Sequence, residues 1–560
     1  MSRFASAATY LPATRRSLSW ISHLAHGRVA IYLIALGVAA YGVVVRCSSL
    51  GRSLWLDEAW VANSILAKSL AGMFYYAAWL QSTPPLFLLL ARTTVSIFGL
   101  SNAVLRIVPS FMGIVAMLCV LLLSARILLR QYALLAWSLF VLSANAVEFS
   151  RTFKQYSSEL AATAAILFVS ALYIQNAIAR RFWLLLVTVM TGLLLAYAVA
   201  FLLPGIALVI WMSPIRRHPA SDVKSYMATS FRRALLFTAI AGGTLIGEYR
   251  LFVTPNSPQV LHAEWAQKNR DIHSFAKLAT DESYDLIGDL PLNHRLQQKN
   301  VRLGAVGLVI ALGFAFAWLR FLKGRRKWLQ IQIACILPCI LLIISDWFEW
   351  YPFVKRTRLF LLPCVIALLV LSLQLVSFYV LKKHRDWVRP FLDIALLGAI
   401  VLTIHAGRSI SRWAAPVEEM DEAVSYLRTH VQPRDFLWVH ASCSEGFKLY
   451  ATMNKWQDAP AHFGKTAWPC CPRGIPDANV TSSELLVRND LGRALPSSFS
   501  GRVWLLYTLR PEHWKGFANE PEIMRAIVRE RDCTAMPTPA FFNVAVSSFD
   551  CKGRAVVELP

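Results

Sequence analysis

The sequence predicts a polytopic α-helical membrane protein with about eleven transmembrane helices and a small α/β domain at its C-terminal end. Of its 560 residues 56% are hydrophobic and only 16% are charged, whereas a soluble domain carries about 25% charged residues. Apolar runs near the length of about 20 residues that crosses the hydrocarbon core recur between residues 29 and 405. From about residue 415 the chain takes on the composition of a soluble domain.

The distribution of positive charge sets the expected orientation. A net charge of +24 would suggest a nucleic-acid ligand in a soluble protein. Here the cations gather in short segments beside apolar runs, as the positive-inside rule describes. We therefore expect a lipid bilayer and no nucleic acid as partner, with a cytoplasmic N-terminal segment. That segment has no apolar core followed by a cleavage site, so the first apolar run is expected to be retained as a helix. The basic clusters assigned to the cytoplasm are 1–28, 126–130, 180–181, 216–233, 320–327 and 382–385.

Threading the chain through the bilayer gives three expected parts: a cytoplasmic segment 1–28, a transmembrane domain 29–414 with a first external loop 47–103, and an external domain 415–560. Further external loops are expected at about 148–158, 253–300 and 347–355. The expected spans with stated limits are about 29–46, 104–125, 131–148, 182–198, 199–213, 234–252 and 389–405.

One apolar run is not counted as a span. Residues 84–99 are apolar but few, and Arg92 interrupts them. Counting this run would reverse the orientation of every later loop. We therefore expect a helix that lies on the outer membrane surface.

The tail is expected to be a small α/β domain with a helix over 420–430 and strands over 435–440 and 503–508. If the tail lies in an oxidising compartment, its odd number of cysteines allows disulfides and leaves one thiol over. Cys47 is a candidate sixth member. The sequence has no CxxC pair, so we expect no zinc site. The five tail cysteines are Cys443, Cys470, Cys471, Cys533 and Cys551.

The first external loop carries two adjacent acids, Asp57 and Glu58, in the run LWLDEAW. Tryptophans on either side would hold this run at the level of the lipid headgroups. One interpretation is the first turn of a helix, where acids are favourable. The other is a catalytic site.

Two later external loops carry cations on the side where the positive-inside rule disfavours them. Such cations either anchor a helix at the interface or bind a phosphate. The first loop has the run SRTFKQY (150–156), and the second has YPFVKRTR (351–358). The candidate side chains are Arg151, Lys154, Tyr156, Lys355, Arg356 and Arg358.

Together these motifs resemble the membrane-embedded GT-C glycosyltransferases related to protein O-mannosyltransferases, the lipid A aminoarabinose transferase and the RgtA/B/C/D-like enzymes. LWLDEA resembles the catalytic Asp-Glu loop of that family, and QSTPPL (81–86) resembles the beginning of its surface helix. FGLS (98–101) followed by LRIVPS (105–110) resembles the start of its second span. SRTFKQY resembles its S-x-E-A-R-x-Y run, with Lys154 at the arginine position, although Arg151 and Thr152 depart from that pattern. RLFLLP (358–363) resembles its R-Y-L-L-P run.

The resemblance, which covers about residues 29–405, implies an inverting transfer of a sugar from a polyprenyl phosphate to an acceptor glycan, lipid or protein. It implies Asp57 as the base, Glu58 as a partner that orients the acceptor or shares that role, and Gln81 as a substrate-binding residue. The cationic candidates and Tyr156 would bind the donor phosphate. No cofactor is expected, and a divalent metal is left open. No Gly-rich nucleotide-sugar motif is present.

Two other classes are weighed: a transporter of polysaccharide or lipid-linked sugar, and an O-antigen polymerase or ligase. A transporter typically carries charged or helix-breaking residues deep in its spans, and most spans here lack them. A polymerase or ligase has no paired-acid first loop. We therefore expect a glycosyltransferase of the bacterial inner membrane with a periplasmic C-terminal domain.

Overall fold

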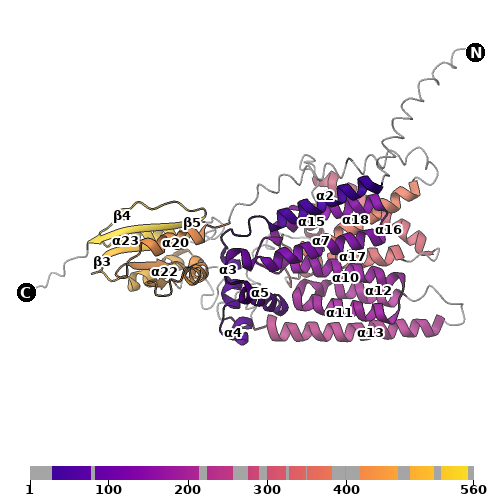
Figure 1. The fold of residues 1–560 in the computed structure, drawn as a ribbon, viewed down its shortest axis with the longest axis horizontal. Helices are drawn as coiled ribbons and strands as arrows, with labels where there is room; N and C mark the ends of the chain where they lie inside the picture. The colour runs from indigo at the N-terminus through magenta and orange to yellow at the C-terminus, as the bar shows by residue number, and fades with distance from the viewer. Residues whose placement is uncertain are drawn as a thin grey trace, which may run out of the picture. The chain divides into compact units, whose positions relative to one another are not determined.

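The computed structural model describes residues 28–76, 82–213, 223–255, 275–288, 299–322, 327–348, 350–380, 398, 417–464, 480–509 and 519–552. The chain folds into two compact units (Figure 1). A helical unit comprises Met1–Ser48, Pro109–Arg250 and Lys268–Trp413. A mixed unit comprises Ser49–Val108, Leu251–Gln267 and Ala414–Pro560. The first external loop of the sequence therefore shares a unit with the tail.

The helical unit is a bundle in which α10 packs on α11, and α12 packs on both α13 and α17. Gly313 lets α16 approach α18 closely, because a Cβ at this position would lie 2.3 Å from the Ser372 Cβ. Its elements are α2 (Arg28–Cys47), α7 (Ile107–Ile127), α8 (Arg130–Val141), α9 (Ala144–Ser150), α10 (Tyr156–Gln175), α11 (Ala179–Leu195), η1 (Tyr197–Leu202), α12 (Leu203–Met212), α13 (Val223–Glu248) with the π-helical turn η3 (Tyr249–Val253), α15 (Phe275–Gly288), α16 (Lys299–Leu322), α17 (Lys327–Trp347), η4 (Leu359–Leu361) and α18 (Leu362–Val380).

Five helical stretches of the described chain are long and apolar enough to cross a membrane. The pair α8 and α9 would make a sixth, although it bends by 51°. Ser143 explains the break, because its side chain caps a new helix by accepting a hydrogen bond from the Ala146 N–H. The five stretches are Asn102–Ile127, Tyr156–Gln175, Met227–Val253, Lys327–Trp347 and Leu359–Tyr379.

The expected count of eleven spans stays a prediction. Three expected spans correspond to shorter apolar helices, Tyr32–Cys47, Tyr197–Met212 and Val306–Arg320. In the second of these, a 3₁₀ turn precedes the proline in the first turn of α12. The expected span 389–405 lies outside the described residues apart from the single position 398.

The mixed unit begins with four short helices from the first external loop, followed by the tail. The expected helix over 84–99 is present as α5, and Pro85 occupies its first turn, where its missing N–H costs nothing. Its position on the outer membrane surface stays a prediction. The elements are α3 (Leu56–Ile65), α4 (Leu70–Phe74), α5 (Pro85–Phe98), α6 (Asn102–Leu105), α20 (Met420–His430), β1 (Phe436–Val439), η6 (Ala441–Cys443), α21 (Ser444–Met453), β2 (Ala461–Phe463), α22 (Val480–Ala494), β3 (Ser500–Thr508), α23 (Glu520–Arg529), β4 (Cys533–Met536) and β5 (Val544–Lys552).

The tail is an α/β domain, as its sequence predicts. Its five strands have the order β2-β1-β3-β5-β4. β1 is parallel to both β2 and β3, while β5 is antiparallel to β3 and β4. The expected helix and both expected strands are confirmed as α20, β1 and β3. The sequence analysis did not identify the other three strands.

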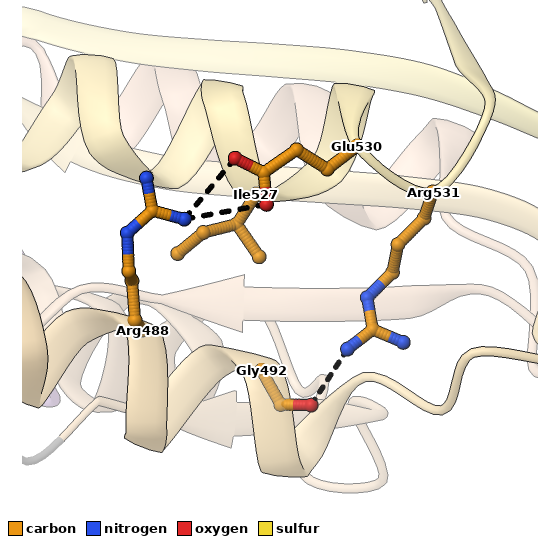
Figure 2. Close-up of a pocket in the computed structure, with 5 residues that line it drawn as sticks. All are labelled: Arg488, Gly492, Ile527, Glu530 and Arg531. Carbon is orange, nitrogen blue, oxygen red and sulfur yellow. Dashed lines mark hydrogen bonds and ion pairs between the residues drawn. The ribbon is translucent and has the colours of Figure 1, made fainter.

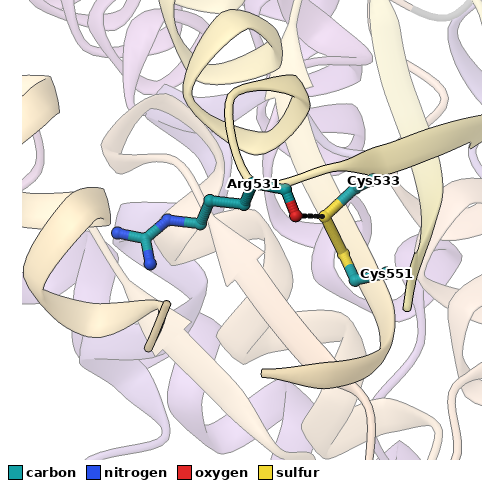
Figure 3. Close-up of a disulfide and its surroundings, with 3 residues drawn as sticks. All are labelled: Arg531, Cys533 and Cys551. Carbon is teal, nitrogen blue, oxygen red and sulfur yellow. Dashed lines mark hydrogen bonds between the residues drawn. A yellow bond between two sulfur atoms is a disulfide. The ribbon is translucent and has the colours of Figure 1, made fainter. Parts of the chain in front are cut away.

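A disulfide joins Cys533 on β4 to Cys551 on β5, which confirms the prediction of at least one bridge in the tail (Figure 3). The two cysteines are direct partners in the antiparallel register, so the bridge ties an edge strand to its neighbour. Cys443 is a buried free thiol and Cys47 an exposed one. Cys470 and Cys471 lie outside the described residues.

Candidate functional site

The two adjacent acids of the first loop lie in the first turn of α3, which begins at Leu56. Both are buried: Asp57 is 6% exposed and Glu58 is 1% exposed. Exposed acids at a helix N-terminus are common, but burying them removes hydration and requires partners. Consecutive residues point about 100° apart around a helix axis. The two carboxylates therefore face different surroundings.

Glu58 is held by Arg106. The Arg106 Nη2 lies 3.0 Å from the Glu58 Oε2 and 3.2 Å from its Oε1, and Nε donates to Oε1 at 3.3 Å. The Glu58 Oε2 also accepts from the backbone N–H of Trp55 at 3.3 Å. Both side chains of this ion pair are buried.

Arg106 also binds the backbone ahead of the acids. Its guanidinium donates to the carbonyl oxygens of Leu50 (2.9 Å), Arg52 and Ser53 (3.2 Å). One buried cation thus holds the loop that leads into α3 and the first turn of α3 together. The sequence analysis assigned Arg106 no such role and treated it only as part of LRIVPS. The position of Arg106 at the start of an apolar run could have predicted a buried ion-pair partner for it.

The tail contacts the same loop through Tyr450 on α21. The buried Tyr450 Oη accepts hydrogen bonds from the backbone N–H of Leu54 (2.5 Å) and from the Ser53 hydroxyl (3.2 Å). It donates to the Asn102 Oδ1 (3.1 Å). Burial raises the pKa of Tyr450, so the hydroxyl stays protonated and can make all three bonds.

Further bonds extend this network. The Ser53 hydroxyl accepts from the Asp421 N–H (3.0 Å), and the Asn102 Nδ2 donates to the Asp421 Oδ2 (3.0 Å). Burial raises the pKa of Asp421, and the bond from Asn102 partly opposes that rise.

A second contact joins the loop to the tail at Glu445, in the first turn of α21. Its Oε2 accepts from the Asn63 Nδ2 and from the Tyr76 hydroxyl, both at 2.8 Å, and its Oε1 lies 2.6 Å from the Lys448 Nζ. Burial, together with the neighbouring carboxylate, raises the pKa of Tyr76. The Tyr76 hydroxyl therefore remains a donor.

In the helical unit, the loop between α9 and α10 buries its cations. Arg151 is fully buried, with its Nη2 3.1 Å from the Glu148 Oε2, and Lys154 is 1% exposed. Arg46 on α2, which the sequence analysis did not single out, is also fully buried and close enough to Arg151 to repel it electrostatically. The burial of these cations distinguishes them from a simple interfacial anchor, whose charged end reaches water.

A close approach of helices α7 and α9 holds this loop. The Ser110 hydroxyl donates to the Ser150 carbonyl at 3.0 Å. A Cβ on Gly113 would lie 2.6 Å from the Ser150 Cβ and 3.4 Å from the Arg46 Cδ. Glycine is therefore the residue that lets α2, α7 and α9 meet here.

The segment before η4 presents three cations in different environments. Arg358 is mostly buried, pairs with Asp285 at 2.9 Å and lies 5.5 Å from the Phe353 ring centre. Lys355 is exposed and Arg356 is half-buried.

Tyr351 links this segment to the start of α10. Burial raises the pKa of Tyr351 well above its ordinary value, Glu159 and Tyr156 raise it further, and Arg356 lowers it. Glu159, Tyr156 and Arg356 therefore each lie within electrostatic reach of Tyr351. Tyr156 and Arg356 come from the two different cationic motifs.

Gln81 lies outside the described residues. No group of three or more His, Cys, Asp or Glu residues able to hold a metal occurs in the described part of the chain. A pocket between α22 and α23 is lined by Arg488, Gly492, Ile527, Glu530 and Arg531 (Figure 2). Arg488 pairs with Glu530 there and Arg531 donates to the Gly492 carbonyl, and none of the sequence-predicted site residues lines it.

Fold and site together define a predominantly helical protein with several helices able to cross a membrane, an α/β tail and a buried acidic turn. No family model matches the chain, and no curated protein matches its sequence. Among solved structures the chain is similar to ArnT from Cupriavidus metallidurans, solved alone and bound to undecaprenyl phosphate. In both states the identity is 13%, the TM-score is 0.49, and the match covers 92% of this chain and 97% of that one. It is also similar to the archaeal oligosaccharyltransferase AglB from Archaeoglobus fulgidus, in complex with an inhibitory peptide and a dolichol-phosphate, at 13% identity and a TM-score of 0.48, over 90% of this chain and 73% of that one.

Proposed function

We propose that this protein is an integral membrane glycosyltransferase that moves a sugar from a polyprenyl phosphate to an acceptor hydroxyl, with inversion, on the periplasmic face of the bacterial inner membrane. The observation that carries the proposal is the buried acidic turn, in which Arg106 fixes Glu58 beside Asp57. An acid pair that served only as a helix-terminal charge would not need an arginine fully buried against it.

Asp57 is the proposed base. An acceptor hydroxyl is too weakly acidic to ionise at neutral pH, so a carboxylate must take its proton as the new bond forms. The acceptor oxygen bonds to the anomeric carbon, the bond from that carbon to the phosphate oxygen breaks, and the hydroxyl proton passes to Asp57. Polyprenyl phosphate leaves with the bonding electrons.

Glu58 is assigned a positioning role. Its Oε1 is engaged by two nitrogens of Arg106, and its Oε2 by Arg106 and the Trp55 N–H. These bonds favour the orienting role that the family resemblance implies for Glu58 over a share in proton transfer.

The donor phosphate is assigned to the cationic motifs of the helical unit. Arg356 and Tyr156 come from different motifs, and each lies within electrostatic reach of Tyr351. Arg358 pairs with Asp285, whose side chain is 55% exposed, and such partly exposed pairs contribute little. A phosphate, which binds arginine through charge-assisted hydrogen bonds, can therefore replace Asp285. Lys154, Arg151 and Lys355 add positive charge.

The proposed role of Asp57 can be tested in cells even when the acceptor is not known. Replacing Asp57 by Ala should cause a polyprenyl-phosphate-linked sugar to accumulate in membrane lipid extracts analysed by mass spectrometry. Asp550→Ala, which removes an exposed acid on β5, is the matched control and should leave the lipid profile unchanged. An unchanged profile for Asp57→Ala would contradict the proposal.

Orientation has its own test. Reporter fusions at His218 and Lys323 should report the cytoplasm, and a fusion after Pro416 should report the periplasm. A cytoplasmic signal from the tail would contradict both the orientation and the periplasmic site.

A further inference from the structure

The tail contacts the acid-bearing loop, residues 49–76, both ahead of α3 and at Asn63 and Tyr76. Three tail residues make these contacts: Asp421 at the start of α20, Glu445 in the first turn of α21, and Tyr450 one turn and a half further along. α21 follows β1 after the short turn η6, so its first turn lies near the carboxyl end of the parallel strands. That edge is where α/β sheets commonly bind ligands. In this protein, Asn63 and Tyr76 of the acid-bearing loop contact the tail there.

From this geometry we propose that Tyr450 is a positioning residue for the transfer reaction, and that holding the acid-bearing loop is the role of the tail. The effect on catalysis rests on the proposed function. The effect of Tyr450 on the structure of the loop does not depend on that function. Tyr450 acts through the backbone at Leu54, three residues before Asp57, and is not proposed to touch substrate.

The hydrogen bonds at Tyr450 are complete. Its oxygen accepts two and donates one, which is the full capacity of a phenol hydroxyl. The Leu54 amide lies just before the first turn of α3, and Arg106 donates to the carbonyls of Arg52 and Ser53 in the same segment. The tail therefore holds a backbone amide, and Arg106 holds backbone carbonyls, of the segment 52–54 that precedes α3.

The position of Asp57 then follows from the segment before it. A catalytic group must be held close to its productive geometry, and a displacement of about 1 Å can cost about 100-fold in rate. Losing the bond to the Leu54 amide frees Leu54, two residues ahead of α3, to move. We therefore expect the loss to affect turnover more than donor binding, because the donor phosphate is assigned to the other unit.

The test replaces Tyr450 by Phe, which keeps the buried ring and removes only the hydroxyl. Tyr507→Phe is the matched control. Tyr507 is equally buried, on β3 of the same domain, and among the described residues its hydroxyl bonds to the tail residues Ser547 and Arg525. Ser53→Ala is the second variant in case Tyr450→Phe does not fold; it removes the other hydrogen bond between the loop and Tyr450, together with the acceptor for the Asp421 N–H.

The first readout needs no substrate. Full-length protein in nanodiscs is followed by hydrogen–deuterium exchange and mass spectrometry. Tyr450→Phe should raise exchange of the Leu54 amide and the first turn of α3 about tenfold, which corresponds to a loss of about 1.4 kcal/mol of hydrogen bonding. Peptides from β3 should keep their protection. Tyr507→Phe should leave the α3 peptide unchanged.

The second readout is kinetic, using release of polyprenyl phosphate from a panel of polyprenyl-phosphate-linked hexoses and pentoses with a membrane glycolipid extract as acceptor. Tyr450→Phe and Ser53→Ala should lower kcat by about 10- to 100-fold with little change in the KM for the donor. Tyr507→Phe should match the unsubstituted protein.

Two results would overturn the inference. One is equal exchange at α3 in Tyr450→Phe and Tyr507→Phe. The other is faster exchange at α3 without loss of turnover. Full turnover by Asp57→Asn would instead remove the proposed function while leaving the exchange result intact, so the two failures are distinguishable.

Discussion

The ion pair between Glu58 and Arg106 makes the sharpest stability prediction. Replacing Glu58 by Gln removes the charge that balances a fully buried guanidinium, while the backbone carbonyls around Arg106 remain. Breaking one side of a buried pair costs about 3–5 kcal/mol, because the remaining charge is left uncompensated. Arg106→Met should cost a similar amount, since it leaves the Glu58 carboxylate buried without its cation.

The double variant separates this charge effect from lost packing. Removing both charges costs less than the sum of the single substitutions, and the coupling should be about 2–3 kcal/mol. Arg92→Met in the same unit is the control. Arg92 is half-buried and donates one hydrogen bond, to the Ala67 carbonyl at 2.9 Å, so its loss should cost about 1 kcal/mol.

The assay is thermal unfolding of purified protein in one detergent, followed by tryptophan fluorescence. A loss of 3–5 kcal/mol lowers the Tm of a unit of roughly 150–250 residues by about 6–20 °C. A Tm change in Glu58→Gln no larger than in Arg92→Met would refute the account. Additive effects in the double variant would show that the two side chains do not act as a pair.

Three further predictions concern other parts of the chain. Gly113→Ala adds a Cβ 2.6 Å from a neighbouring helix and should destabilise the helical unit by about 1–3 kcal/mol, seen as a lower Tm in detergent. Removing the disulfide by Cys533→Ser with Cys551→Ser should cost about 2–5 kcal/mol, measured as faster proteolysis of the tail. Folding raises the pKa of Asp421 above its ordinary value of 3.8. The ionised carboxylate therefore destabilises the folded state, and this effect grows as the pH rises from 3.8 to the pKa in the folded protein. Asp421→Asn should therefore raise the Tm at neutral pH but not below pH 3.8, and an equal effect at both would contradict this sign.

Local patterns predicted local structure well. The helix over 420–430, the strands β1 and β3 and the helical run 84–99 each depend on periodicity or on proline within one short segment. The acidic turn at Asp57 was recognisable for the same reason. The prediction of a tail disulfide needed only the concentration of cysteines and an oxidising compartment.

Long-range partners were beyond such reasoning. Glu58 and Arg106 are 48 residues apart, and the Leu54 amide and the Tyr450 hydroxyl are 396 apart. No periodicity within a segment encodes which distant side chain will satisfy a buried charge or amide. Burial does state that some partner must exist. The association of the first loop with the tail likewise became visible only in the folded chain.

The central claim is that Asp57 takes the proton from the acceptor. Its most direct test is the transfer rate of purified Asp57→Asn in nanodiscs, measured with polyprenyl-phosphate-linked sugars and a membrane glycolipid acceptor, beside the binding of polyprenyl phosphate alone. Asparagine keeps the size of the side chain and its ability to accept a hydrogen bond, but it cannot take up a proton. The account predicts a loss of about 10²–10⁴-fold in the rate with unchanged binding of polyprenyl phosphate. Near-normal transfer by Asp57→Asn would contradict it and would leave Asp57 as an acidic residue of the first helical turn.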